Sequence, residues 1–201
     1  MPIQQIFPQP IYISKLDRAL TKEELRAINK HKKKMYKNEG NTTSNDNYVL
    51  ENKTLQNLKK DLNKQVLDYF DKVICTTNSI TPYITQSWLN YTQPNQYHHR
   101  HYHSNSYASG ILYIDADKEV DSVVFFKMDD VTLELSVTKH NMFNATSWKF
   151  PVAPGDLFIF PSRLHHAVEK KKGTNTRVSL SFNVFFKGEI GLKSDLTALT
   201  I

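Results

Sequence analysis

Thr176-Arg-Val-Ser-Leu-Ser-Phe-Asn183 alternates polar and apolar side chains from Arg177 onward. Because successive side chains of a β-strand point to opposite faces, this period of two predicts a strand with one polar and one apolar face. Arg177 and Ser179 fall together on the polar face. The apolar face consists of Val178, Leu180, Phe182 and Val184. The stretch therefore predicts a sheet that is apolar on one side and carries a positive charge beside a hydroxyl group on the other.

The same period of two extends over the second half of the chain. From Ser79 onward, turn-forming residues recur about every ten residues, which is typical of antiparallel β-structure. Pro154-Gly-Asp156, for example, predicts a tight turn before an apolar strand. Strands are expected over residues 83–91, 107–114, 122–127, 131–138, 148–152, 156–160, 165–168 and 177–186. About eight short strands predict a mainly β fold, a double-stranded β-helix of the jelly-roll, cupin-like kind.

Two amphipathic helices are expected before these strands. Thr21-Lys-Glu-Glu24 has the form of a capping box and predicts a helix over residues 22–36. Apolar residues at every third or fourth position from Leu55 predict a second helix to about residue 74. Residues 38–47, rich in Asn, Gly, Ser and Thr, predict a mobile loop between the helices.

The composition fits one domain with a sizeable core, since 39% of the 201 residues are hydrophobic. The apolar stripes of the helices need a sheet to cover. We therefore expect a single domain over residues 1–201, in which the N-terminal α-helices (1–78) pack on one sheet of a jelly-roll core (79–190).

Charge and cysteine content narrow the class of protein further. No run of about 18 apolar residues is present, so a membrane partner is not expected and a cytoplasmic location is predicted. The single cysteine, Cys75, has no partner for an internal disulfide and is predicted to be a buried structural thiol. The net charge of +6 has its excess near His31-Lys-Lys-Lys34, which is interpreted as a solvated helix end. Nucleic-acid binding is not expected, because no recognised binding motif accompanies this charge.

Four of the eight histidines lie in His98-His-Arg-His-Tyr-His103. On a strand, His101 and His103 share a face and could chelate a metal ion, with His98 and His99 upstream at a turn. A third ligand is expected from His165-His166. Adjacent strand residues point to opposite faces, so only His166 is predicted to enter the site. The alternatives are a core histidine at His166 and adventitious metal binding by a surface cluster.

Arg177 is predicted to need a negative partner, because an unmatched buried charge is costly. Its planar guanidinium suits a carboxylate, and Ser179 could donate one more hydrogen bond. An internal Asp or Glu could also be the partner. With three histidines nearby, the favoured hypothesis is a bound dicarboxylate, so that a metal and an acid would share one pocket.

Together these features resemble the 2-oxoglutarate and Fe(II)-dependent dioxygenases, in particular the small oxygenases met in marine phages and bacteria. The matching stretches are Ser87-Trp-Leu-Asn90, His101-Tyr-His-Ser-Asn-Ser106, Ser109-Gly-Ile-Leu-Tyr113, Pro154-Gly-Asp156, Phe160-Pro161, His166-Ala-Val168 and Arg177-Val-Ser-Leu-Ser-Phe-Asn183. They cover about residues 84–186, in order and at compatible spacing.

The resemblance implies a double-stranded β-helix in which His101 and His166 bind Fe(II). It also implies that Arg177 and Ser179 hold the distal carboxylate of 2-oxoglutarate, whose keto acid end chelates the metal. The implied activity uses dioxygen to hydroxylate a small molecule or a protein side chain, and releases succinate and carbon dioxide. Residues 38–47 and 139–146 are expected to form the variable walls of the site mouth.

One position departs from the wider superfamily, which has His-x-Asp or His-x-Glu where this chain has His101-x-His103. Either His103 is the third ligand, which we favour, or Asp115 or Asp156 approaches from elsewhere, or water fills the position. Two other functions stay open at this point. One is a cupin-like three-histidine metal dioxygenase or isomerase without 2-oxoglutarate, and the other is a non-enzymatic metal or carboxylate-binding module. Arg177-x-Ser179 favours the oxygenase, because a three-histidine site alone needs no dicarboxylate anchor.

Overall fold

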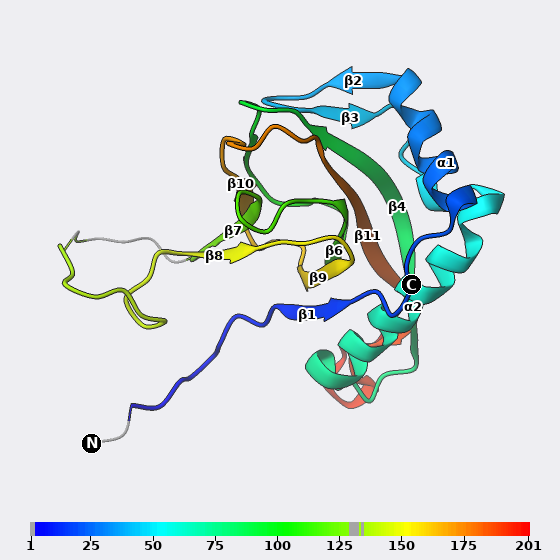
Figure 1. Cartoon of the computed structure of the whole chain (residues 1–201). Coiled ribbons are helices and arrows are strands. Elements are labelled where there is room, and N and C mark those ends of the chain that lie inside the picture. Colours follow the sequence, from blue (N-terminus) through cyan, green and yellow to red (C-terminus); the bar gives the residue numbers. More distant parts are fainter. Residues whose placement is uncertain (1–2, 129–132, 134) are drawn as a thin grey trace.

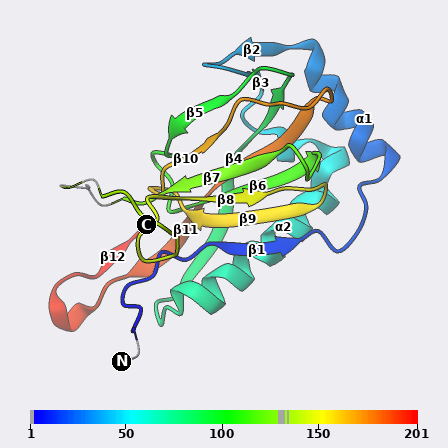
Figure 2. The same ribbon diagram turned by 60° about the vertical axis from the view of Figure 1, so that its left-hand side comes forward.

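The computed structural model describes residues 3–128, 133 and 135–201, which form two antiparallel sheets that face each other (Figures 1 and 2). The larger sheet has the order β1-β9-β6-β11-β4-β3-β2, with β12 paired to β11, and the smaller sheet has the order β5-β10-β7-β8. The strands of the larger sheet are β1 (Tyr12–Lys15), β2 (Met35–Lys37), β3 (Thr42–Ser44), β4 (Ile80–Thr92), β6 (Ala108–Asp115), β9 (Asp156–Pro161), β11 (Arg177–Ile190) and β12 (Leu199–Thr200). The strands of the smaller sheet are β5 (His98–His101), β7 (Ser122–Phe126), β8 (Ser147–Pro151) and β10 (His166–Val168). The predicted mainly β fold, a double-stranded β-helix, is confirmed.

The helices α1 (Lys22–Lys30) and α2 (Gln56–Tyr69) cover the outer face of the larger sheet (Figure 1). One hydrophobic cluster joins Leu58 and Leu62 of α2 to Leu180 and Phe182 of β11. A second cluster, which includes Ile111, Phe125 and Phe158, fills the space between the sheets. The apolar face of the 176–183 stretch therefore packs under the helices, and its polar face looks inward.

The first helix is shorter than predicted. It begins at the predicted capping box, in which the Thr21 hydroxyl accepts from the backbone of Glu24 and the Glu24 carboxylate accepts from the backbone of Thr21. It ends at Lys30 rather than residue 36, and a 3-10 turn (His31–Lys33) leads into β2. The predicted loop over 38–47 instead contains β3, because Thr42 and Thr43 pair with the edge of β4. Pairing with β4 has therefore made a strand of a segment whose composition predicted a loop.

The second helix and seven of the eight expected strands are found with small shifts of their ends. The helix continues beyond α2 as a π-helical segment (Phe70–Ile74), as far as the sequence predicts. Four short strands were not expected as such, namely β1, β2, β3 and β12. A fifth, β5, replaces the turn that was predicted at His98 and His99.

The expected strand over 131–138 is not found in the part of it that the structure describes. Residues 131, 132 and 134 lie outside the described residues. Residue 133 and residues 135–138 form no strand, and Leu133 and Leu135 are exposed. The physical reason is that β7 and β8 pair directly with each other, so the segment between them is a connection.

The structure also corrects the prediction made for Cys75. Cys75 is exposed rather than buried, because it ends the π-helical segment in a left-handed conformation, with φ of 50°. No described helix is both long and apolar enough to cross a membrane. The single-domain organisation and its division at residue 78 stay predictions, although β1, β2 and β3 of the predicted helical part join the larger sheet.

Gly110 shows how tightly the larger sheet is packed. It pairs with Phe182 of the neighbouring strand β11, and the aromatic ring lies over its backbone. A Cβ atom at position 110 would come within 2.1 Å of Phe182 Cζ. Glycine is therefore required here for close packing, although its own φ is not in the left-handed region.

Candidate metal centre

Three histidines from two neighbouring strands meet at one point between the sheets. His101 ends β5 and pairs in register with His166, the first residue of β10, while His103 follows β5. Their ligand nitrogens lie within 4.8 Å of one another. The ring centroids are 4.3 Å apart for His101 and His166, 5.0 Å for His103 and His166, and 5.4 Å for His101 and His103. The structure therefore brings together the three histidines that the sequence singled out.

The reason for this convergence differs in part from the prediction. Strand alternation was expected to place His101 and His103 on one face, but β5 ends at His101. His103 is held instead by its backbone N–H, which donates to the carbonyl of Ser162 at 2.9 Å. The adjacent histidine, His165, stays outside the group and packs its ring against Tyr102.

Each of the three imidazoles is oriented by an acceptor at Nδ1. His101 Nδ1 donates to the carbonyl of its neighbour His99 at 2.8 Å, and His166 Nδ1 donates to the carbonyl of Leu164 at 3.1 Å. His103 Nδ1 donates to Asn183 Oδ1 at 2.8 Å. With Nδ1 protonated, the lone pair of each ring is at Nε2. Metal-binding histidines are commonly arranged in this way, since an acceptor at the other ring nitrogen fixes the tautomer and orientation of the imidazole.

Burial keeps these rings neutral at physiological pH. It lowers the pKa of His103 to about 4 and lowers the pKa of His101, and it places the pKa of the almost fully buried His166 well below its ordinary value. The neighbouring imidazoles act in the same direction, because positive charges on adjacent rings repel. A neutral imidazole is the form that binds a transition metal, so the site is ready for a cation without losing protons.

No carboxylate replaces His103 in this group. The candidate metal-binding groups found among the described residues contain only histidines. Asp115 is exposed at the end of β6. Asp156 accepts from the backbone of Ala153 at 2.8 Å and stabilises the turn before β9. Neither aspartate that the sequence offered as an alternative is brought to the histidines.

Arg177 and Ser179 lie on the inward face of β11, at the end remote from Asn183. Arg177 is only 3% exposed, and its Nη2 donates to Thr92 Oγ1 at 2.8 Å. This is its only hydrogen bond to the described residues, although a guanidinium has five donor hydrogens. The charge of Arg177 also helps to lower the pKa of His98, after burial and the neighbouring imidazoles.

An internal acid, Asp121, does lie beside Arg177. An internal Asp or Glu was the alternative partner that the sequence analysis left open for this arginine. Asp121 Oδ1 is 3.8 Å from Arg177 Nη1, but the same carboxylate accepts two shorter bonds, of 2.8 and 2.9 Å, from Lys171 Nζ. The side chains of Asp121 and Lys171 are fully buried. Two buried cations thus share one buried anion, which leaves a net charge of +1. An unpaired buried charge is unfavourable, so this cluster favours a bound anion.

Tyr113 is a further candidate that the sequence analysis did not select. It faces Ser179 across the sheet, is buried, and has its pKa raised to about 12 by that burial. Neither the phenol of Tyr113 nor the hydroxyl of Ser179 has a hydrogen-bond partner among the described residues. Both can therefore donate to an anion next to Arg177. The signal was present in Ser109-Gly-Ile-Leu-Tyr113, whose alternation puts Tyr113 on the inward face.

Comparisons with known proteins support this assignment of fold and chemistry. A sequence profile of the family described as "Putative 2OG-Fe(II) oxygenase" matches residues 86–183, a range that includes all the residues of the metal centre and acid pocket discussed above. Over this range the chain has the sequence pattern of the 2OG-Fe(II) oxygenases. A search of curated proteins found no significant match. The family uses Fe(II) and 2-oxoglutarate, and the neutral imidazoles and the buried positive cluster of this oxygenase fit both.

Solved structures share the fold of this oxygenase at low sequence identity. The epimerase SnoN, in complex with Fe3+, alpha ketoglutarate and nogalamycin RO, has a TM-score of 0.62 at 10% identity, covering 90% of this chain and 81% of its own. A prolyl hydroxylase from Trichoplax adhaerens, with a hypoxia inducible factor peptide fragment, has a TM-score of 0.59 at 11% identity, covering 87% and 83%. HygX from Streptomyces hygroscopicus, with nickel, 2-oxoglutarate and hygromycin B, has a TM-score of 0.57 at 10% identity, covering 88% and 82%.

Proposed function

We propose that this oxygenase holds Fe(II) with His101, His103 and His166 and binds the distal carboxylate of 2-oxoglutarate with Arg177 and Ser179. The observation that carries the proposal is the convergence of three neutral imidazoles whose Nδ1 atoms are all bound to acceptors. The substrate is proposed to be a small molecule or a peptide side chain, which is hydroxylated at a C–H bond.

The protein's own part in the reaction is orientation and exclusion of water. When bound, iron and 2-oxoglutarate supply the oxidising chemistry, in which dioxygen is consumed and succinate and carbon dioxide are released. The carbonyls of His99 and Leu164 fix the rings of His101 and His166. Arg177, Ser179 and Tyr113, all three of them buried, supply donors to one carboxylate. Donors fixed by burial bind the co-substrate in a single orientation relative to the metal.

The third histidine changes the charge of the centre. A site with two histidines and one carboxylate lowers the charge around Fe(II) by one unit, whereas three neutral histidines leave it unchanged. The centre therefore attracts anions more strongly, which favours a chelating keto acid as an additional ligand. This is also why the cupin-like alternative is not adopted, since it leaves the net charge of +1 on the buried cluster of Asp121, Lys171 and Arg177 unbalanced.

The β2–β3 hairpin is proposed to form one wall of the substrate entrance. Its turn lies against β5, because the backbone of Tyr97 donates to the carbonyl of Gly40 at 3.0 Å (Figures 1 and 2). Asn38, in this turn, has its Nδ2 atom 3.3 Å from Nε2 of His98 on β5. The connection at 139–146, the other predicted wall, projects away from the two sheets (Figure 1). We therefore assign substrate selection to the hairpin.

The solved structures with this fold leave two possible classes of substrate, because one was solved with hygromycin B and another with a peptide fragment. The measurement that chooses between them is succinate release under air, with and without pools of metabolites and peptides. A pool that contains the substrate should raise succinate release above the uncoupled background.

The binding of iron and co-substrate is tested by an anaerobic titration of Fe(II) with 2-oxoglutarate. A weak visible charge-transfer band should appear at one equivalent of each. The His101→Ala and His166→Ala variants should lose the band and the metal, and His165→Ala should keep both. Tight iron in the first two variants would contradict the proposed ligands. The predicted cytoplasmic location is a separate proposal, to be checked by cell fractionation.

A further inference from the structure

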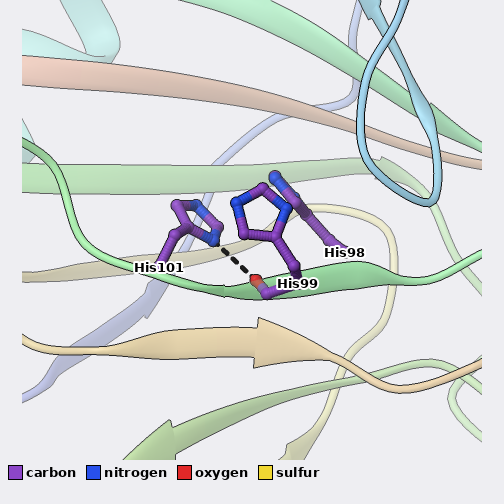
Figure 3. A group of neighbouring side chains, drawn as sticks. All are labelled: His98, His99 and His101. Carbon is purple, nitrogen blue, oxygen red and sulfur yellow. Dashed lines mark hydrogen bonds between the residues drawn. The ribbon is translucent and has the colours of Figure 1, made fainter.

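The strand β5 carries more histidine than the proposed iron site uses. A β-bulge causes this, because three steps from His98 to His101 on β5 lie opposite two steps from Val168 to His166 on β10. A bulge turns an extra side chain toward one face of a strand. The rings of His98 and His99 therefore lie on the same side of β5 as His101, as Figure 3 shows.

These three rings form a group of the same dimensions as the proposed iron site. The ligand nitrogens of His98, His99 and His101 lie within 4.8 Å of one another. Their ring centroids are 4.2, 5.1 and 5.2 Å apart, against 4.3, 5.0 and 5.4 Å in the first group. A bound Zn2+ lies about 2.0–2.1 Å from each ligand nitrogen. Because the spacing of the rings is similar in the two groups, a metal ion would require similar shifts of the histidine side chains in either of them.

The environment of His99 points to a cation. His99 Nδ1 is shielded from solvent and has no hydrogen-bond partner among the described residues. The carboxylate of Glu39, on the turn of the β2–β3 hairpin, lies 3.8 Å from this nitrogen. Three imidazoles with one carboxylate in reach are a ligand set for a tetrahedral divalent ion such as Zn2+. His99 Nδ1 is thus a buried nitrogen that makes no hydrogen bond to the described residues and is free to bind a metal ion.

We propose that His98, His99 and His101 form a second transition-metal site, suited to Zn2+, which excludes metal from the first site because both need His101. His101 has one free ligand atom, since its Nδ1 donates to the carbonyl of His99 and only Nε2 is open. The ring cannot serve two ions through one nitrogen. Zinc in the second site therefore withdraws a ligand from the iron centre, and this exclusion rests on the proposed function. The site offers a reversible means of inhibition by zinc.

The test uses metal binding rather than turnover. In the His103→Ala/His166→Ala variant the first group is lost, and we expect it to bind one Zn2+ or Co2+ per chain, with the intense visible absorption of tetrahedral Co2+. Adding His98→Ala or His99→Ala should lower the affinity by at least about tenfold, since even changes outside the ligand shell cost that much. His140→Ala, which changes an exposed histidine, is the matched control and should have no effect.

Two outcomes would overturn the second site: no metal bound in the His103→Ala/His166→Ala variant, or binding that His98→Ala and His99→Ala leave unchanged. If loss of the buried His166 unfolds the chain, His103→Ala alone carries the same comparison. Exclusion is tested in the wild-type protein, where zinc plus iron should never exceed one ion per chain. Two ions bound together would refute the exclusion. Zinc binding in the variant with no iron binding in the wild type would refute the proposed function alone.

Discussion

His103 is the residue at which this chain differs from the wider superfamily, and its ring is held by Asn183 and lies beside Trp88. The Asn183 side chain also accepts from Ser109, so the orientation of the ring is built into two strands. Such an arrangement is expected for a ligand, whereas a ring that only faces solvent needs no fixed tautomer.

We predict that His103→Asp retains Fe(II) and 2-oxoglutarate, whereas His103→Ala loses most of both. Aspartate would create the ordinary set of two histidines and one carboxylate, while alanine leaves two ligands. Metal content and the intensity of the charge-transfer band are the measurements. Wild-type values for both variants would remove His103 from the iron site.

Arg177→Lys is predicted to weaken 2-oxoglutarate binding by about 1.5–3 kcal/mol, the scale of one charge-assisted hydrogen bond. An ammonium group keeps the charge but cannot make the two-pronged contact of a guanidinium with a carboxylate. Calorimetry measures the change, and Fe(II) affinity serves as the control because it should stay the same. Unchanged 2-oxoglutarate affinity would place the anchor elsewhere.

At the scale of elements, local sequence patterns predicted the features that depend on capping and on strand alternation, namely where a helix begins and which face of a strand a residue occupies. The capping box fixed where α1 begins, and the period of two located β11 and put Arg177 on the inward face. The end of α1 could not be predicted from the sequence, because the chain after it forms β2 and β3, and β3 pairs with the distant strand β4. The bulge in β5 was equally hidden, since it depends on register with β10, which lies more than 60 residues later. The inward-facing histidines at 98 and 99 were missed for that reason.

Gly110→Ala is predicted to destabilise the protein by about 1–3 kcal/mol, the usual cost of overpacking a core. The new methyl group would overlap the ring of Phe182 on the neighbouring strand, and both strands are fixed by their pairing. Urea unfolding measures the loss. The double variant Gly110→Ala/Phe182→Leu should lose less than the sum of the single changes, because the smaller side chain makes room. Strict additivity would show that the contact is not the cause.

At the scale of the whole molecule, the buried histidines link stability to pH. Burial lowers the pKa of His98 to about 2 and that of His103 to about 4, so that the unfolded chain binds more protons than the folded chain at pH values below about 6.5. The contribution to stability is therefore present above this pH and lost as the pH falls. Metal-free protein should lose about 1 kcal/mol per buried histidine between pH 6.5 and 5.5, measured by urea unfolding. His103→Gln should make this dependence shallower.

The buried charges of Asp121, Lys171 and Arg177 tie the connection before β7, the segment before β11 and β11 itself into one unit. Asp121→Asn leaves two buried cations without an anion, so we predict a loss of about 3–5 kcal/mol in the free energy of unfolding. The exposed Asp115→Asn is the control and should change it by no more than about 0.5 kcal/mol. If Arg177 anchors 2-oxoglutarate, the carboxylate of this ligand supplies the negative charge that the Asp121→Asn variant lacks, so the variant should bind it more tightly. The same concentration of 2-oxoglutarate should then stabilise the Asp121→Asn variant more than the wild type, since a ligand that binds the folded state more tightly stabilises it more. Stabilisation of the wild type alone would mean that the carboxylate is bound away from this cluster.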